Sequence, residues 1–227
     1  MSRLCLWCAG VVFFAGVVML GTAASGGPPG EEYEYVGSKK CKKCHVKLWK
    51  SWAGTKMART FHALKADSEL KPDKKTGLTK EFIEEIKAAK AKAKAKIEPE
   101  KDYTQDPKCL KCHTTGYGES GGYTTPDPQD RKAQRQAEAL AGVGCEACHG
   151  PASKYVEILD EIQDEQRQYT RAELYAAGMK KIDAKDCTSC HTKTDNPTAG
   201  DDYKFDFEES KDKDTHEHVK MKLRKGE

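Results

Sequence analysis

Four copies of one short motif place the strongest constraint on how this chain can fold. Each copy reads C-x-x-C-H, and the copies span residues 41–45, 109–113, 145–149 and 187–191 of the 227-residue sequence. They use eight of the ten cysteines: Cys41, Cys44, Cys109, Cys112, Cys145, Cys148, Cys187 and Cys190. The other two, Cys5 and Cys8, lie in an apolar stretch near the N-terminus. Every cysteine beyond that stretch therefore belongs to one repeated unit.

The spacing within the motif has a chemical reason. Two thiols three positions apart on one turn of backbone reach the two vinyl groups at one edge of a porphyrin, and C-x-x-C-H is the attachment signature of c-type haem. The next residue then brings an imidazole to the iron, which makes His45, His113, His149 and His191 the proximal ligands. The motifs therefore predict four covalently bound haem c groups with their irons. Their redox chemistry favours an electron carrier.

Three other chemistries use C-x-x-C pairs, and each fits this sequence less well. A zinc site gives no reason for a histidine after every second cysteine. A disulfide within each motif would be strained and redox-active, and nothing explains four of them in one chain. Thioredoxin-like chemistry needs a βαβ pattern, which the sequence lacks.

An export signal precedes the motifs. Arg3 supplies the positive start, Leu4 to Leu20 form an apolar run, and Thr22-Ala23-Ala24 gives a cleavage site of small residues. We therefore expect a signal peptide over residues 1–24 and a single tetrahaem cytochrome c domain over residues 25–227, in the periplasm or otherwise exported. The alternative is an uncleaved membrane anchor, because the run has the minimum length of a spanning helix.

The rest of the chain is too polar to fold comfortably by itself. Across the whole sequence 37% of the residues are hydrophobic and 33% are charged. Such a chain needs an additional source of apolar bulk. We expect the haems to form the core of a mainly α fold with long loops and little or no β structure.

Helical periodicity predicts five helices around the motifs. The first covers residues 46–66 with an interruption at Gly54, the second runs from the N-cap Thr79 to a stop at Pro99, and the third covers residues 131–140. The fourth contains the apolar stripe Tyr155, Ile158, Leu159 and Ile162. The fifth is short and runs from a capping box of Thr170 and Glu173 to Gly178. The alternating Ala and Lys residues of the second helix predict a solvated face rather than a binding tract.

The formal net charge of +3 does not indicate a nucleic-acid partner. Four haems would add about eight propionates, partly offset by the irons, so the loaded protein would be mildly acidic. The sequence also contains no nucleic-acid-binding motif. We expect redox proteins as partners, with donor and acceptor left open, and a membrane only if the N-terminal segment stays uncleaved.

The sequence resembles the tetrahaem cytochrome c-554 family, whose founding member accepts electrons from hydroxylamine oxidoreductase. The resemblance runs from about Gly37 to Tyr155 and resumes around the fourth motif and the C-terminus. Its most specific stretches are residues 40–45 with Ser51-Trp52, residues 101–106, residues 121–124, residues 142–151 and His216-Glu217-His218. Membership would imply stacked and angled haem pairs, with three six-coordinate irons and one five-coordinate iron at the second motif.

The resemblance also implies the distal ligands. It assigns His216 to the fourth haem, whereas the distal histidine of the third haem matches Met57 and that of the first haem matches Leu159. Two of the three distal histidines are therefore absent. A thioether also ligates haem iron, so Met57 is predicted to bind iron at a raised potential. His218 is expected to be solvated, and His62 to serve a different iron or none.

The missing histidines keep a second function open. An iron without a distal ligand binds and reduces small nitrogen or sulfur oxides, so a haem enzyme is the alternative to the electron carrier. A gas or redox sensor is less favoured because no signalling module is attached.

Overall fold

The fold is described from a computed structural model for residues 32–192, 196–200, 203–211, 213, 215–217 and 220–226. The predicted signal peptide and His218 lie outside the described residues. The elements of the described part are, in chain order, α1 (Ser38–Cys41), α2 (Val46–Ala53), α3 (Lys56–Arg59), the 3-10 helices η1 (Thr60–Leu64) and η2 (Asp67–Glu69), α4 (Lys80–Lys92), α5 (Pro107–His113), α6 (Arg131–Leu140), α7 (Cys145–His149), α8 (Ser153–Glu165), α9 (Arg171–Ala176), α10 (Ala184–Thr188) and α11 (Phe207–Ser210).

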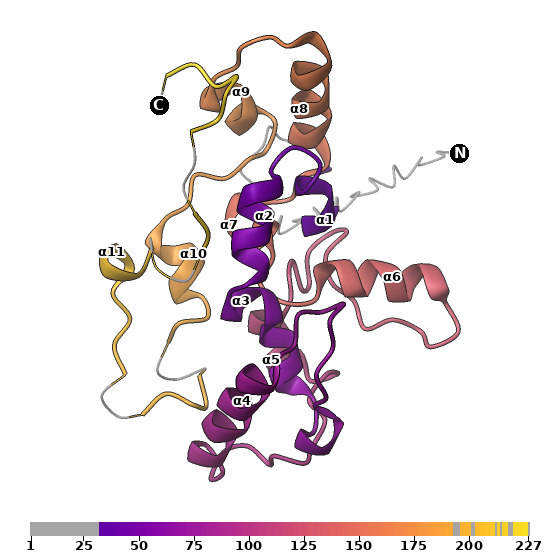
Figure 1. Ribbon diagram of the computed structural model, residues 1–227, viewed down its shortest axis with the longest axis vertical. Coiled ribbons are helices and arrows are strands. Elements are labelled where there is room, and N and C mark those ends of the chain that lie inside the picture. Colours follow the sequence, from indigo (N-terminus) through magenta and orange to yellow (C-terminus); the bar gives the residue numbers. More distant parts are fainter. Residues whose placement is uncertain are drawn as a thin grey trace, which may run out of the picture.

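The helices are short and are joined by long connections (Figure 1). Helices α2 and α3 form a central column, with α8 and α9 towards one end and α4 and α5 towards the other. No strand forms within the described residues, where β pairing is limited to isolated bridges such as Thr114 with Ala141. The prediction of a mainly α fold with long loops is therefore confirmed.

Local capping signals in the sequence position several of these helices. The Thr79 hydroxyl accepts a hydrogen bond from the Phe82 amide at 3.2 Å and starts α4, as predicted. Helix α6 has the predicted bounds, and Gly54 separates α2 from α3. Helix α4 ends at Lys92, earlier than the expected stop at Pro99, because the backbone turns at Ala93.

The capping box predicted for α9 is only partly right. The Thr170 hydroxyl accepts from the Glu173 amide, but the Glu173 carboxylate pairs with Arg167 at 2.6 Å. A complete capping box starts α10 instead, where Asp183 and Asp186 each accept from the other's backbone amide. This box fixes the helix that leads into the fourth motif.

Apolar side chains gather in three small clusters rather than one core. The first joins α8 and α9 around Tyr155, Ile162 and Leu174. The second surrounds Leu110 of α5 and Leu140 of α6. The third packs α4 against the loop before it. Clusters of this size agree with a chain that relies on a bound apolar group for the rest of its core.

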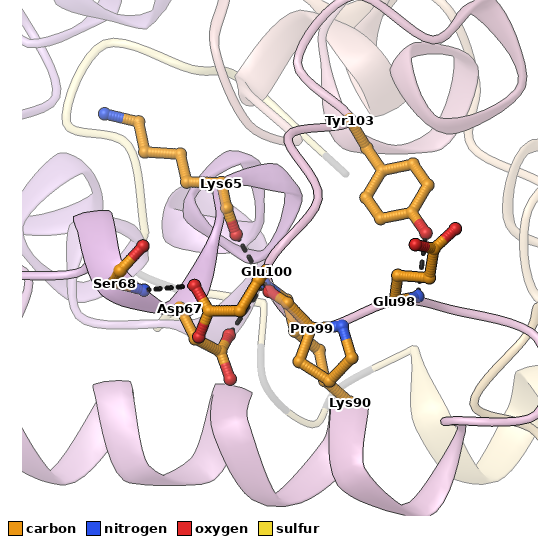
Figure 2. A network of polar contacts seen from close by, with 8 residues as sticks. All are labelled: Lys65, Asp67, Ser68, Lys90, Glu98, Pro99, Glu100 and Tyr103. Atoms are coloured by element: carbon orange, nitrogen blue, oxygen red, sulfur yellow. Dashed lines mark hydrogen bonds and ion pairs between the residues drawn. The ribbon is translucent and has the colours of Figure 1, made fainter.

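One lysine of α4 departs from the predicted solvated face. Lys90 is buried, and its ammonium donates to the carbonyl of Lys65, to Asp67 at 2.9 Å and to the carbonyl of Pro99 (Figure 2). The other members of the alternation, Lys92, Lys94 and Lys96, are exposed as predicted. Lys90 thus connects α4 to the backbone before it, at Lys65, and to the backbone after it, at Pro99.

Within the described residues, no helix is both long enough and apolar enough to cross a membrane.

Candidate haem attachment sites

The first motif spans a junction between two helices. Cys41 ends α1, and His45 is the N-cap residue of α2. Cys44, between them, is exposed. Burial and the nearby His216 ring lower the pKa of His45, which favours the neutral imidazole that binds a metal.

The second motif lies wholly within α5. Asp106 caps this helix by accepting from the Lys108 amide at 2.9 Å. The Nδ1 atom of His113 lies 2.8 Å from the carbonyl oxygen of Thr60 and 2.9 Å from its hydroxyl. A carbonyl only accepts, so Nδ1 carries the proton and Nε2 presents its lone pair, as in metal-bound histidines. Burial also lowers the pKa of His113.

The third motif forms α7, and a residue between its cysteines holds it in place. The Glu146 side chain is 1% exposed and accepts from the backbone amides of Val36, Gly37 and Ala152 at 2.9, 2.6 and 2.9 Å. Burial raises the pKa of Glu146, while these three amides oppose the rise. The C-x-x-C-H pattern leaves the two residues between the cysteines unspecified. Glu146 is instead the residue that fastens the third motif to the segment before the first.

The fourth motif differs from the other three in having an exposed histidine. Cys187 lies in α10, while Cys190 and His191 follow the helix. His191 is exposed, its Nδ1 lies 2.9 Å from the Tyr203 hydroxyl, and Phe205 stacks on its ring with centroids 4.7 Å apart. Neither Tyr203 nor Phe205 stood out in the sequence, because both lie in a charged segment with no periodic pattern.

The four motifs meet through their cysteines. The Cys41 thiol hydrogen-bonds to Cys145, which raises the pKa of Cys41 and lowers that of Cys145. Burial and the neighbouring Cys187 raise the pKa of Cys148 to about 11. The sulfur of Cys190 lies 4.0 Å from the carbonyl oxygen of Lys111, within the second motif. The third motif is therefore next to the first and the fourth, and the fourth is next to the second.

The residues present fit c-type haem. None of the eight motif cysteines forms a disulfide, so all eight sulfurs are available for thioether bonds to haem. The ring centroids of His149 and His216 lie 6.3 Å apart, with the ring planes 26° from parallel. An imidazole nitrogen binds a metal at about 2.0 Å, so two imidazoles on opposite sides of one metal have centroids roughly 6 Å apart. The separation of His149 and His216 matches that of two axial ligands on one iron.

The pairing of His216 with His149 differs from the one implied by the family resemblance, which assigned His216 to the fourth haem. The segment that carries His216 is anchored on α2, where the Glu217 amide donates to the Ser51 hydroxyl at 3.0 Å. This anchor brings His216 to the third motif. Sequence spacing alone gave no means of choosing between the third and fourth motifs.

The other candidate ligands lie on different elements. Met57 is a partly buried residue of α3, and its carbonyl accepts from the Val143 amide at 3.0 Å, two residues before the third motif. His62 lies in η1, where its Nδ1 is buried without a hydrogen-bond partner. Burial is the main cause of the lowered pKa of His62. Leu159 lies on α8 next to Asp160, which forms an ion pair with Lys43 of the first motif at 2.8 Å.

The comparisons with known proteins agree with this arrangement. The family model described as cytochrome c554 and c-prime matches residues 40–85 and 73–150. Cytochrome c-554 of Nitrosomonas europaea is 31% identical over 220 residues, covering 88% of this chain and 82% of the relative. The solved structure of the reduced state of cytochrome c554 from the same organism superposes with a TM-score of 0.63 at 28% identity, covering 87% of this chain and 92% of that one.

The identity, the coverage and the shared helical fold agree with the attachment motifs. The chain carries covalently bound haem c, and its role is that of a c-type cytochrome in electron transfer. It belongs to the cytochrome c-554 family.

Proposed function

We propose that this chain is an exported carrier that passes electrons through four covalently bound haems. The observation that supports this proposal most strongly is the continuous contact between the motifs. The first adjoins the third through Cys41 and Cys145, the third adjoins the fourth through Cys148 and Cys187, and Cys190 reaches the second. Haems attached at adjoining motifs would lie close enough to exchange electrons within one protein.

The chain would hold each haem by two thioether bonds and one proximal histidine. His45, His113, His149 and His191 take the proximal role, and His216 is the second axial ligand of the third haem. An iron holds two axial ligands, so Met57 would serve one of the other haems. The haem supplies the reversible one-electron couple. The protein sets the spacing, fixes the tautomer of His113 through the Thr60 carbonyl, and places the Tyr203 hydroxyl beside Nδ1 of His191.

Redox titration of the exported, haem-loaded protein tests the carrier proposal. Reduction should take up four electrons per chain, and the reduced protein should pass them to an added oxidant without consuming a further substrate. A protein that takes up electrons but cannot release them to any one-electron acceptor would contradict the proposal. For Met57, the ferric protein should show the near-infrared band of a His/Met haem, and Met57→His should abolish it.

A second function is favoured by one specific observation. The sequence has seven histidines, of which only His62, His216 and His218 lie outside the motifs, so at least one of four irons lacks a second histidine. If neither Met57 nor another side chain fills that position, such an iron would bind small nitrogen or sulfur oxides. Turnover of nitric oxide, hydroxylamine or sulfite by the reduced protein, faster than its reaction with one-electron acceptors, would make it an enzyme instead of a carrier.

A further inference from the structure

The charges of this chain are strongly segregated around the first motif. Between Tyr35 and Ala66 the sequence has nine lysines and arginines and no aspartate or glutamate. This stretch forms α1, α2, α3 and η1, so it contains the entire first motif and the central column. A run of this length with one sign of charge creates a local positive field, although the chain as a whole is nearly balanced.

Most of this charge is not neutralised within the protein. Lys39 and Lys40 of α1 and Lys47 and Lys50 of α2 are exposed, and no acidic side chain of the described residues pairs with them. Lys47 and Lys50 are three positions apart and therefore share one face of α2. A fifth lysine, Lys42, places its ammonium 4.3 Å from the Trp49 ring, which connects the two helices.

An apolar spot lies among these lysines. Val46 is 44% exposed, a high value for a large aliphatic side chain in this structure. It follows His45 directly, and Cys44, the second attachment cysteine, is the only exposed cysteine of the eight in the motifs. The second attachment cysteine of the first motif is therefore at the surface, two positions from an exposed valine and on a short stretch of chain that carries several exposed lysines.

We propose that this surface, formed by Lys39, Lys40, Lys42, Lys47 and Lys50 around Cys44 and Val46, is the docking site for an acidic electron-transfer protein. The proposal rests on the carrier function proposed above and adds the place and the chemistry of the partner. Complementary charge around a small apolar centre raises the rate of encounter and orients the partner, while the centre excludes water at the point of contact. The first haem would then be the one that exchanges electrons with this partner.

A protein partner fits the surface better than a flat anionic membrane. Helix α8 borders the surface through the ion pair of Lys43 with Asp160, and it also carries Glu161, Asp164 and Glu165. A sheet of anionic lipid approaching the lysines would meet these carboxylates and be repelled. A protein whose acidic patch is limited in area avoids them.

Stopped-flow electron transfer from an acidic protein tests the proposal. The donor is the hydroquinone of a bacterial flavodoxin, and the acceptor is the oxidised, haem-loaded chain. The bimolecular rate constant for the unsubstituted chain should fall about tenfold or more between low and high ionic strength, as electrostatic steering predicts. The triple variant Lys39→Glu, Lys47→Glu, Lys50→Glu should lose about tenfold at low ionic strength and show a flat or reversed salt dependence.

The matched control is Lys92→Glu, Lys94→Glu, Lys96→Glu, which changes the net charge equally at exposed lysines near α4. Its rate should stay within about twofold of the unsubstituted chain. Equal losses in both triple variants would overturn the proposal, because they would show an effect of net charge alone. Binding to phosphatidylserine vesicles that the first triple variant abolishes, with an unchanged flavodoxin rate, would overturn it in favour of a membrane. In either case the four-electron titration would still report on the carrier function separately.

Discussion

The second and fourth motifs hold their proximal histidines in opposite ways. His113 is partly buried at the end of a complete helix, and its Nδ1 lies against a backbone carbonyl and a hydroxyl from Thr60. His191 is exposed after the end of α10, and within the described part of the chain its Nδ1 meets a side-chain hydroxyl, that of Tyr203. A carbonyl cannot be removed by mutation, whereas a phenol can. The second site is therefore fixed by the fold itself, and the fourth depends on individual side chains.

The largest difference should appear in stability. Leu110, within the second motif, is 0% exposed, so Leu110→Ala should lower the free energy of unfolding by about 2–5 kcal/mol. Ile182, just before α10, is 38% exposed, and Ile182→Ala should change the free energy of unfolding by about 0.5 kcal/mol or less. Denaturant unfolding of the haem-loaded variants measures both. Similar losses at the two positions would remove the distinction between a buried and an open site.

Removal of His216 tests whether this histidine is the second axial ligand of the third haem or of the fourth. His216→Ala should free one iron to bind about one further equivalent of carbon monoxide per chain, because it removes an axial imidazole. In a variant that lacks the fourth haem, Cys187→Ser with Cys190→Ser, the same gain should persist if His216 serves the third haem. His218→Ala, two positions along the chain, is the matched control and should leave carbon monoxide uptake unchanged. Loss of the gain in the variant without the fourth haem would instead assign His216 to the fourth haem.

The smallest effect should be on haem potentials. A hydrogen bond donated by Nδ1 makes the imidazole a stronger ligand of ferric iron, so Tyr203→Phe should raise one potential. A net hydrogen bond is worth about 0.5–1.5 kcal/mol, which corresponds to roughly 20–60 mV for one electron. Thr60→Val keeps the carbonyl that holds His113 and should shift its haem much less. Spectroelectrochemical titration compares the two, and a larger shift for Thr60→Val would reverse the comparison.

The sequence predicted what depends on neighbours along the chain. The N-cap at Thr79 and the bounds of α6 each involve residues a few positions apart, and both agree with the structure. It missed contacts between distant residues. Glu146 accepts hydrogen bonds from the amides of Val36 and Gly37, more than a hundred positions away. No pattern in the neighbouring residues indicates that role.

The same limit explains the error at Lys90 and the unexpected position of His216 beside the third motif. A lysine in an Ala-Lys alternation looks solvated until the carbonyls of Lys65 and Pro99 converge on it. Likewise, the choice of iron for His216 depends on the anchor at Ser51, which only the folded chain brings near. Met57 as an iron ligand and the signal peptide over residues 1–24 stay predictions.

The central claim is that each of the four motifs carries a haem and that together they form one electron-transfer unit. Intact-mass measurement of the exported protein, combined with a pyridine haemochrome assay on the same sample, tests it most directly. The mass should equal that of a chain beginning near Ser25 plus four haems, and the haemochrome should give four haems per chain. A fully matured protein with fewer than three haems would contradict the claim.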